Sequence, residues 1–423
     1  MSYNARSDVE YSMLVPEQPQ GYQAKESAWL HEQNAKSQRS KWIVTAVGFL
    51  ALIGIGVGIG VGVSVANKSN NAAVVVNNGT SSAAAGSTTT SSSAPNPSGG
   101  VTNSDPNDPS NFQKNAAFHK VFWGMAYTPN GSIMPNCGAT QAEVITDIQI
   151  MSQLTDTVRL YGADCNVTAL VLNAIKLTKV DMKVYIANYI SPDDKVAYTR
   201  QKAIIEDALK TYGVDNIVGL TVGNEQILQA AQAQHTEDPN SELVKPVADY
   251  IIESINDTRS SLKALGYNNI KVGTSEAGYY FNTEVLKVCE YGLSNFHAWF
   301  AETKVSDAVQ WVWTNFKEEN VDKAALLTNQ PEMIIAETGW PTGSKTTADA
   351  RLNITGGEAS AANLQVFLDN FVCQSNTQGV KYFYFELFDE MWKDALYGGV
   401  EGYWGILDKD KNLKPGITIP TCQ

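Results

Sequence analysis

The sequence predicts an eight-fold β/α barrel (a TIM barrel) preceded by a single transmembrane helix and a disordered stalk. From residue 120 onward, short apolar runs alternate with segments of helical periodicity, as the strands and helices of such a barrel do. Glu225 and Glu337 each stand where an apolar run ends, which is where a barrel carries its catalytic side chains. Nearer the N-terminus, residues 42–66 contain no charged residue, which indicates a membrane span.

The 423 residues accordingly divide into four segments. Residues 1–41 are polar, with few large apolar side chains, and are expected to form a disordered cytoplasmic tail. As a helix, residues 42–66 would be about 38 Å long, enough to cross a hydrocarbon layer of about 30 Å. Residues 67–113 are rich in Ser, Thr, Ala, Gly, Asn and Pro, a composition typical of an extended extracellular stalk. Residues 114–423 are expected to form the catalytic barrel.

The flank before the apolar segment is more positive than the flank after it. Lys36, Arg39 and Lys41 lie shortly before the segment, and Lys68 alone lies shortly after it. Because the more positive flank stays in the cytoplasm, we expect a single-pass type II protein with its barrel outside the cell. A cleaved signal peptide is the alternative, but the long polar segment in front and the length of the apolar run disfavour it.

Glycine recurs at every second position between residues 54 and 62, which generates overlapping Gly-x-x-x-Gly pairs. Such pairs allow two membrane helices to approach closely. They leave room for a weak dimer through the transmembrane glycines, although alternating glycines define no single packing face.

The cysteines and several Asn-x-Ser/Thr sequons fit an outward-facing domain. Cys137 and Cys165 each fall in a loop after an apolar run, where neighbouring strand ends would meet, so we favour this disulfide. We then pair Cys373 with Cys422 and leave Cys289 as a buried free thiol. Spacing alone does not fix the connectivity, and other pairings stay open.

The barrel prediction depends on eight apolar runs and the helical segments between them. The expected strands are residues 121–127, 157–161, 183–190, 217–222, 270–274, 293–300, 333–336 and 381–388. The expected helices are residues 142–154, 167–177, 198–212, 247–265, 305–319 and 359–374. A doubly wound open sheet is the main alternative. The barrel is favoured because Glu225 and Glu337 stand at the ends of its fourth and seventh strands, on the face where barrel enzymes carry their catalytic residues.

Composition excludes several classes of function. The net charge of −13, with scattered lysines and arginines, provides no basic patch for nucleic acid. The sequence contains no phosphate-cradling glycine loop, no Cys-x-x-Cys and no His-Glu-x-x-His motif, and it has four histidines in total. We therefore expect no cofactor and no metal site.

Two carboxyl groups in one cleft are suited to cleaving glycosidic bonds. One carboxylic acid protonates the leaving oxygen, while the other, as a carboxylate, attacks the sugar or activates water. Glu225 follows Asn224, whose amide can hold a sugar hydroxyl, and Glu337 precedes Thr338, Gly339 and Trp340, whose ring could stack on a sugar. Either glutamate alone could equally cap a helix or pair with a lysine.

These residues carry a resemblance to a known family. Residues 335–341 (Ile-Ala-Glu-Thr-Gly-Trp-Pro) resemble the nucleophile signature of glycoside hydrolase family seventeen, the β-1,3-glucanases and glucanosyltransferases, and particularly its membrane-anchored fungal members. Residues 222–225 are similar to its acid/base strand, residues 159–162 to its second strand and residues 384–390 to its eighth. The resemblance covers residues 120–422. It implies a retaining mechanism on β-1,3-glucan, with Glu225 as acid/base and Glu337 as nucleophile.

Further residues are expected around these two glutamates. Arg159 could orient Glu337 or contact sugar, or instead pair with a structural carboxylate. His297 and Trp299 belong to an apolar sixth strand, where they could equally be core residues or face the cleft. Asp389 and Glu390 fit a salt-bridged loop, so we leave them out of the site. The expected substrate-binding residues are Arg159, Tyr161, Asn224, Glu276, Tyr279, Trp340 and Glu386.

The most favoured function is therefore an endo-β-1,3-glucanase that remodels the cell wall from the plasma membrane. The alternatives are a β-1,3-glucanosyltransferase and a catalytically weak glucan-binding surface protein. Intact acids at both positions favour an enzyme. Hydrolysis and transfer share one glycosyl-enzyme and differ in what attacks it, so the sequence does not separate them.

Overall fold

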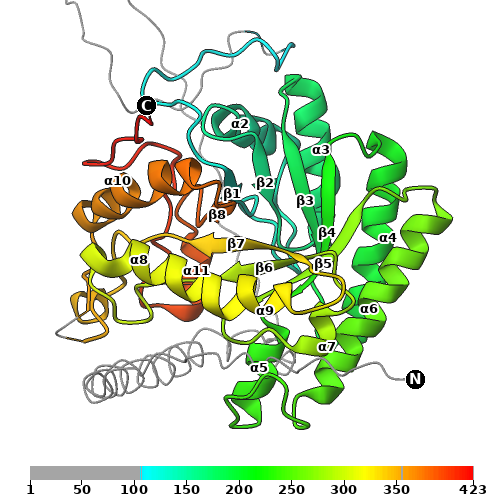
Figure 1. Cartoon of the computed structure of the whole chain (residues 1–423). Helices are drawn as coiled ribbons and strands as arrows, with labels where there is room; N and C mark the ends of the chain where they lie inside the picture. The colour runs from blue at the N-terminus through cyan, green and yellow to red at the C-terminus, as the bar shows by residue number, and fades with distance from the viewer. Residues whose placement is uncertain (1–104, 106, 354–355, 423) are drawn as a thin grey trace, which may run out of the picture.

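The computed structural model describes residue 105 and residues 107–353 and 356–422 (Figure 1). The predicted cytoplasmic tail, the predicted transmembrane helix with its dimer-forming glycines and most of the predicted stalk lie outside these residues. Within the described part of the chain, no helix combines the length and apolar character needed to cross a bilayer.

Eight parallel strands close into a barrel in sequence order, each paired with the next and the last with the first, and helices cover its outside (Figure 1). The predicted fold class is thus confirmed, and an open doubly wound sheet is not formed. The strands are β1 (Gly124–Ala126), β2 (Thr157–Arg159), β3 (Lys183–Asn188), β4 (Ile217–Asn224), β5 (Lys271–Ala277), β6 (Tyr291–Asn295), β7 (Glu332–Thr338) and β8 (Tyr382–Tyr384).

The helices follow the strands in the alternation that the sequence predicts. Their bounds are α2 (Gln141–Met151), α3 (Val167–Thr178), α4 (Lys195–Tyr212), α5 (Gln226–Ala233), α6 (Lys245–Ala264), α7 (Thr283–Leu286), α8 (Val305–Phe316), α9 (Asp322–Ala325), α10 (Ala361–Thr377) and α11 (Met391–Tyr397). The sequence did not predict α5, α7, α9 or α11. A helix of four to eight residues is too short to show a sustained apolar period.

The predicted sixth strand extends too far. β6 ends at Asn295, and residues 296–300 form a loop on the barrel's C-terminal face. The loop contains large apolar side chains that pack against other rings. Phe296 and Trp299 are 1% and 3% exposed for this reason. Apolar character alone therefore did not mark the end of the strand.

The register of β4 and β7 gains one residue at the catalytic end of each strand. Thr221 pairs with Gly273 and Asn224 with Ser275, so three residue steps on β4 match two on β5. In the same way, Ser294 pairs with Ile335 while Asn295 pairs with Glu337 on β7. An extra residue reverses the side to which later side chains point. The two shifts therefore turn Asn224 and Glu337 toward the barrel axis.

The core has two layers. Tyr185, Tyr291, Leu293, Ile334, Ala336 and Phe383 fill the barrel interior. The larger layer lies between strands and helices. Gly273 of β5 is required here, because a Cβ at this position would collide with the carbonyl oxygen of Tyr291. Polar side chains lie above the interior layer, so the barrel is solid below its catalytic end.

Both favoured disulfides are present. Cys137–Cys165 joins the loops that follow β1 and β2, and Cys373–Cys422 fixes the C-terminal segment to α10. Cys289 is a buried free thiol, as predicted. The first bridge confirms that these loops meet at the C-terminal ends of neighbouring strands.

Candidate active site

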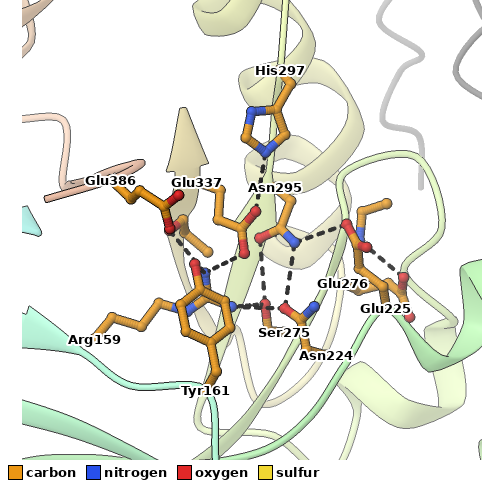
Figure 2. Close-up of polar contacts among 12 residues, drawn as sticks. Arg159, Tyr161, Asn224, Glu225, Ser275, Glu276, Asn295, His297, Glu337 and Glu386 are labelled. Atoms are coloured by element: carbon orange, nitrogen blue, oxygen red, sulfur yellow. Dashed lines mark hydrogen bonds and ion pairs between the residues drawn. The ribbon is translucent and has the colours of Figure 1, made fainter. Parts of the chain in front are cut away.

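Polar side chains from the C-terminal ends of the strands converge at one end of the barrel (Figure 2). Glu337 is the penultimate residue of β7, and Glu225 directly follows β4. The prediction that both glutamates stand at the catalytic face is confirmed. In Figure 2, Asn295 lies between their two carboxyl groups.

Arg159 is the centre of the polar network. It is the last residue of β2, and 1% of its surface is exposed. Its guanidinium donates to oxygen atoms that come from several strands. These are Glu337 Oε1 (2.7 Å), the Ala336 carbonyl (3.0 Å), Tyr161 Oη (3.2 Å), Asn224 Oδ1 (2.7 Å) and Ser275 Oγ (2.8 Å). Arg159 thereby holds the ends of β4, β5 and β7 in a fixed arrangement.

Glu337 is held on both sides. Arg159 contacts Oε1, and Nε2 of His297 lies 3.0 Å from Oε2. Burial alone would raise the pKa of Glu337, but the charge of Arg159, helped by His297, outweighs burial and lowers the pKa to about 2. This carboxylate is therefore ionised and oriented at neutral pH.

Glu225 has the opposite environment. Its backbone is left-handed (φ 59°) and follows Gly223 (φ 84°), so the chain turns sharply between β4 and α5. Asn295 donates to its carboxyl at 2.8 Å, and the residue is partly buried. Burial, followed by the negative charge of Glu337, raises the pKa of Glu225 to about 7. Glu225 therefore keeps its proton up to neutral pH.

The two glutamates together supply a proton donor and an ionised carboxylate at the same end of the barrel. Widely separated pKa values in two neighbouring carboxyl groups assign an acid role to one and a nucleophile or base role to the other. Glu225 can protonate a leaving oxygen, and Glu337 can attack or stabilise an electron-poor carbon. The resemblance in sequence implies the same two roles, and the roles themselves stay a prediction.

Three expected binding residues lie within the Arg159 network. Asn224 accepts from Arg159, and the ring of Tyr161 lies 4.3 Å from the guanidinium. Arg159 itself orients Glu337, which was one of the two roles predicted for it. Sugar contacts by these residues stay a prediction.

The expected sugar contact through Glu276 requires correction. Glu276 is 3% exposed, and its carboxylate accepts from the backbone amides of Ile227 (2.8 Å) and Leu228 (3.4 Å). These amides belong to the first turn of α5, which lacks partners within the helix. Glu276 therefore anchors the helix that Glu225 begins, and its carboxylate is not directed at substrate.

The predicted stacking of a sugar on Trp340 is wrong. The ring has no exposed surface, packs near Phe367, and donates its N–H to the carbonyl of Glu358 at 2.9 Å. Its position beside Glu337 reflects packing between the barrel and α10. Tyr279 packs against Phe296 and donates to Asn315 of α8, outside the Arg159 network.

Glu386 follows β8 and is 1% exposed. Lys393 of α11 lies 2.7 Å from Glu386 and 2.9 Å from Glu390, so one ammonium joins two buried carboxylates. Glu386 appears on the Arg159 and Tyr161 side of Figure 2. Glu390 was left out of the site predicted from sequence and was expected to lie in a salt-bridged loop. Its ion pair with Lys393 fits that expectation and places it next to Glu386.

Ser275 and Asn295 were not predicted from the sequence, and His297 was left open between a core role and a role in the cleft. Ser275 lies in β5, and Asn295 is the last residue of β6. Their signal was present, since each is a polar residue at the catalytic end of a strand. His297 lies in the loop that was mistaken for strand. Among the described residues, no group of His, Cys, Asp and Glu side chains has the geometry of a metal site.

Sequence comparison relates the chain to fungal proteins. The profile of the BtgE/BtgC glycoside hydrolase domain matches residues 124–405. The putative glucan endo-1,3-β-glucosidase btgC of Aspergillus niger is 32% identical over 338 residues, covering 76% of this chain and 47% of that protein. Glucan endo-1,3-β-glucosidase btgC of Emericella nidulans is 34% identical over 318 residues, covering 72% and 46%. The chain thus spans about half the length of the curated relatives it matches.

Solved structures share the barrel. The glycoside hydrolase family 17 β-1,3-glucanosyltransferase of Rhizomucor miehei is 24% identical and superimposes with a TM-score of 0.56, covering 71% of this chain and 98% of that one. An endo-laminarinase from Formosa is 15% identical, with a TM-score of 0.54 and coverages of 71% and 91%. At these identities the likeness concerns the fold.

The paired pKa values predict the dependence of kcat/KM on pH. Glu225 must be protonated to donate, so kcat/KM for glycoside cleavage should fall as pH rises through about 7. Glu337 must be ionised, so the acidic decline should centre near pH 2, provided the fold survives there. Initial rates across pH, checked by circular dichroism at each value, measure both limbs. A basic limb near pH 4.5 would contradict the burial effect on Glu225.

Proposed function

Because the chain belongs to the BtgE/BtgC glycoside hydrolase family, we propose that it cleaves β-1,3-glucan internally with retention of anomeric configuration. The observation that carries this proposal is the contrast between Glu337, ionised against Arg159 and His297, and the protonated Glu225. The naming of the btgC relatives as glucan endo-1,3-β-glucosidases supports the choice of substrate.

In the first step, a carboxylate oxygen of Glu337 attacks the anomeric carbon. The bond to the leaving oxygen breaks, and that oxygen takes the proton of Glu225. In the second step, ionised Glu225 removes a proton from water, which attacks the same carbon and releases Glu337 as a carboxylate. Arg159 and Asn295 keep the two carboxyl groups in place throughout, because each donates to one of them.

Transfer to a second sugar is the alternative outcome of the same intermediate. A sugar hydroxyl then replaces water and gives up its proton to Glu225. The likeness in fold to the Rhizomucor miehei β-1,3-glucanosyltransferase keeps this alternative in view. Chromatography of the products from a defined laminari-oligosaccharide distinguishes the two, since transfer yields products longer than the substrate.

Azide rescue tests the roles of the glutamates. Glu225→Ala should still form the glycosyl-enzyme from an activated aryl β-glucoside, and added azide should release it as the β-glycosyl azide. Glu337→Gly removes the nucleophile, so azide should enter from the opposite face and give the α-glycosyl azide. Turnover of β-1,3-glucan should fall by several orders of magnitude in both variants.

Proton NMR of the azide products identifies the anomers. An α-azide from Glu225→Ala would reverse the two roles. Activity equal to that of the unaltered enzyme in both variants would remove the glycosidase proposal.

We also propose that residues 42–66 anchor the chain in the plasma membrane as a type II protein whose barrel faces the cell wall. The support is the uncharged run of 25 residues with its basic N-terminal flank. The chain should resist alkaline carbonate extraction, and protease added outside spheroplasts should digest the barrel. A soluble product that begins near Asn67 would instead show a cleaved signal peptide.

A further inference from the structure

The loop between β1 and α2 carries an acceptor sequence for N-linked glycosylation. Asn130, Gly131 and Ser132 form an Asn-x-Ser sequon in this loop. The backbone N–H of Ser132 donates to the carbonyl of Pro129 at 3.1 Å, and Gly131 has a left-handed φ of 77°. Residues 129–132 therefore form a tight turn with Asn130 at its corner. Asn130 is exposed to solvent there.

Three consecutive apolar residues lie at the surface of the same loop. Ile133 is 37% exposed, Met134 is 49% exposed, and Pro135 beside them is exposed as well. Contact with water is unfavourable for apolar side chains, so a run of three at the surface is uncommon unless it has a function. Ile133, the first of the run, directly follows the sequon. The run and the sequon are thus neighbours on the surface.

The loop is closed at its base, which keeps the apolar run at the surface. The backbone N–H of Gly138 donates to the carbonyl of Gly131 at 2.7 Å, and Cys137 is joined to Cys165 in the loop after β2. The Arg159 network contains no residue of this segment. A change at Asn130 therefore removes none of the contacts that hold the catalytic glutamates.

The other sequons in the described part of the chain have different surroundings. Asn353 is half-buried, and its Oδ1 accepts from a backbone amide at 2.6 Å, which leaves less room for a bulky group. Asn166 and Asn256 are exposed. Asn256 lies on α6, where no large apolar residue is exposed. Of the three exposed asparagines, Asn130 is the one with an exposed apolar run in its own loop.

We propose that Asn130 carries an N-linked glycan that covers Ile133, Met134 and Pro135. This inference rests on the proposed placement of the barrel outside the cell, because chains on that route pass through the compartment where N-glycans are attached. Sugar rings present apolar C–H faces and a rim of hydroxyl groups. The glycan can therefore lie over the apolar run with its C–H faces while its hydroxyl groups stay hydrated.

The modification is a group transfer from an oligosaccharide that is linked to a lipid diphosphate. The Asn130 side-chain nitrogen attacks the anomeric carbon of the first sugar, so that a C–N bond forms. The bond from this carbon to the diphosphate oxygen breaks, the nitrogen releases a proton, and the lipid diphosphate leaves with the electron pair. Ser132 is 7% exposed in the folded turn and donates its hydroxyl to Pro129 at 2.6 Å. The cell's transferase must therefore read the sequon before the turn closes.

The first test measures the occupancy of each sequon. The full chain is expressed in a fungal host that attaches N-glycans and is then treated with peptide N-glycosidase F in heavy-oxygen water. This enzyme converts a glycosylated asparagine to labelled aspartate, which mass spectrometry assigns to its position in the chain. We expect the label at residue 130 and its loss in Asn130→Gln.

The second test measures whether the glycan covers the apolar run. Dilute hydrogen peroxide converts exposed methionine to its sulfoxide, and mass spectrometry of the peptides gives the rate. Met134 should oxidise about threefold faster in Asn130→Gln than in the glycosylated chain, because the covering sugars are absent. Enzymatic removal of the glycan from the folded, unaltered chain should have the same effect, which separates covering from a folding defect of the variant.

Two controls accompany the oxidation measurement. Asn256→Gln removes an exposed sequon on α6 and should leave the rate at Met134 unchanged. Met391, which is partly exposed on α11, should oxidise at the same rate in every chain.

An unlabelled residue 130 in a chain that is glycosylated elsewhere would overturn the proposal. Equal oxidation rates at Met134 with and without the glycan would overturn it as well. Absence of glycans from every sequon would overturn it together with the proposed placement outside the cell. Failure of the catalytic proposal looks different, since the unaltered chain would then not cleave β-1,3-glucan whatever residue stands at position 130.

Discussion

The buried ion pair between Arg159 and Glu337 is the interaction on which the catalytic end of the barrel depends. A guanidinium at 1% exposure needs partners for its charge and its donors, and oxygen atoms from β4, β5 and β7 accept from both of its terminal nitrogens, Nη1 and Nη2. Loss of one partner from such a pair costs about 3–5 kcal/mol, because the other charge stays buried. The same contact therefore orders strand ends that are distant in sequence and keeps Glu337 ionised.

That charge on Glu337 also determines what Glu225 can do. Burial disfavours a second negative charge in the cleft, and the carboxylate of Glu337 disfavours it further, so Glu225 retains a proton. Burial of Glu225 and the cation beside Glu337 thus give two identical side chains different protonation states. Lys393 plays a comparable part after β8, where it joins Glu386 and Glu390 and ties α11 to the loop that follows the strand. Charge pairing among buried side chains therefore recurs at the ends of β2, β7 and β8.

The barrel and the pair of glutamates could be predicted because both depend on local sequence patterns. Alternating apolar and helical segments gave the barrel, and glutamates at the ends of apolar runs gave the catalytic pair. The extra residue in β4 and in β7 could not be foreseen, since a register shift depends on the neighbouring strand. The role of His297 stayed open because its loop is as apolar as a strand. Trp340 was misjudged because proximity to Glu337 in sequence does not determine the side to which a ring points. The register shifts and the positions of these two side chains depend on contacts between segments that are distant in the sequence.

Carbon-13 NMR of the glutamate carboxyl groups during a pH titration tests the central claim most directly. Spectra of Glu225→Gln and Glu337→Gln assign the two signals by their loss. We predict that the Glu337 carboxyl titrates at about pH 2 and the Glu225 carboxyl at about pH 7. The Glu225 value should also fall when Gln replaces Glu337, since the neighbouring charge is then removed. Two titrations near the ordinary glutamate pKa of about 4.3, or a reversed order, would contradict the account.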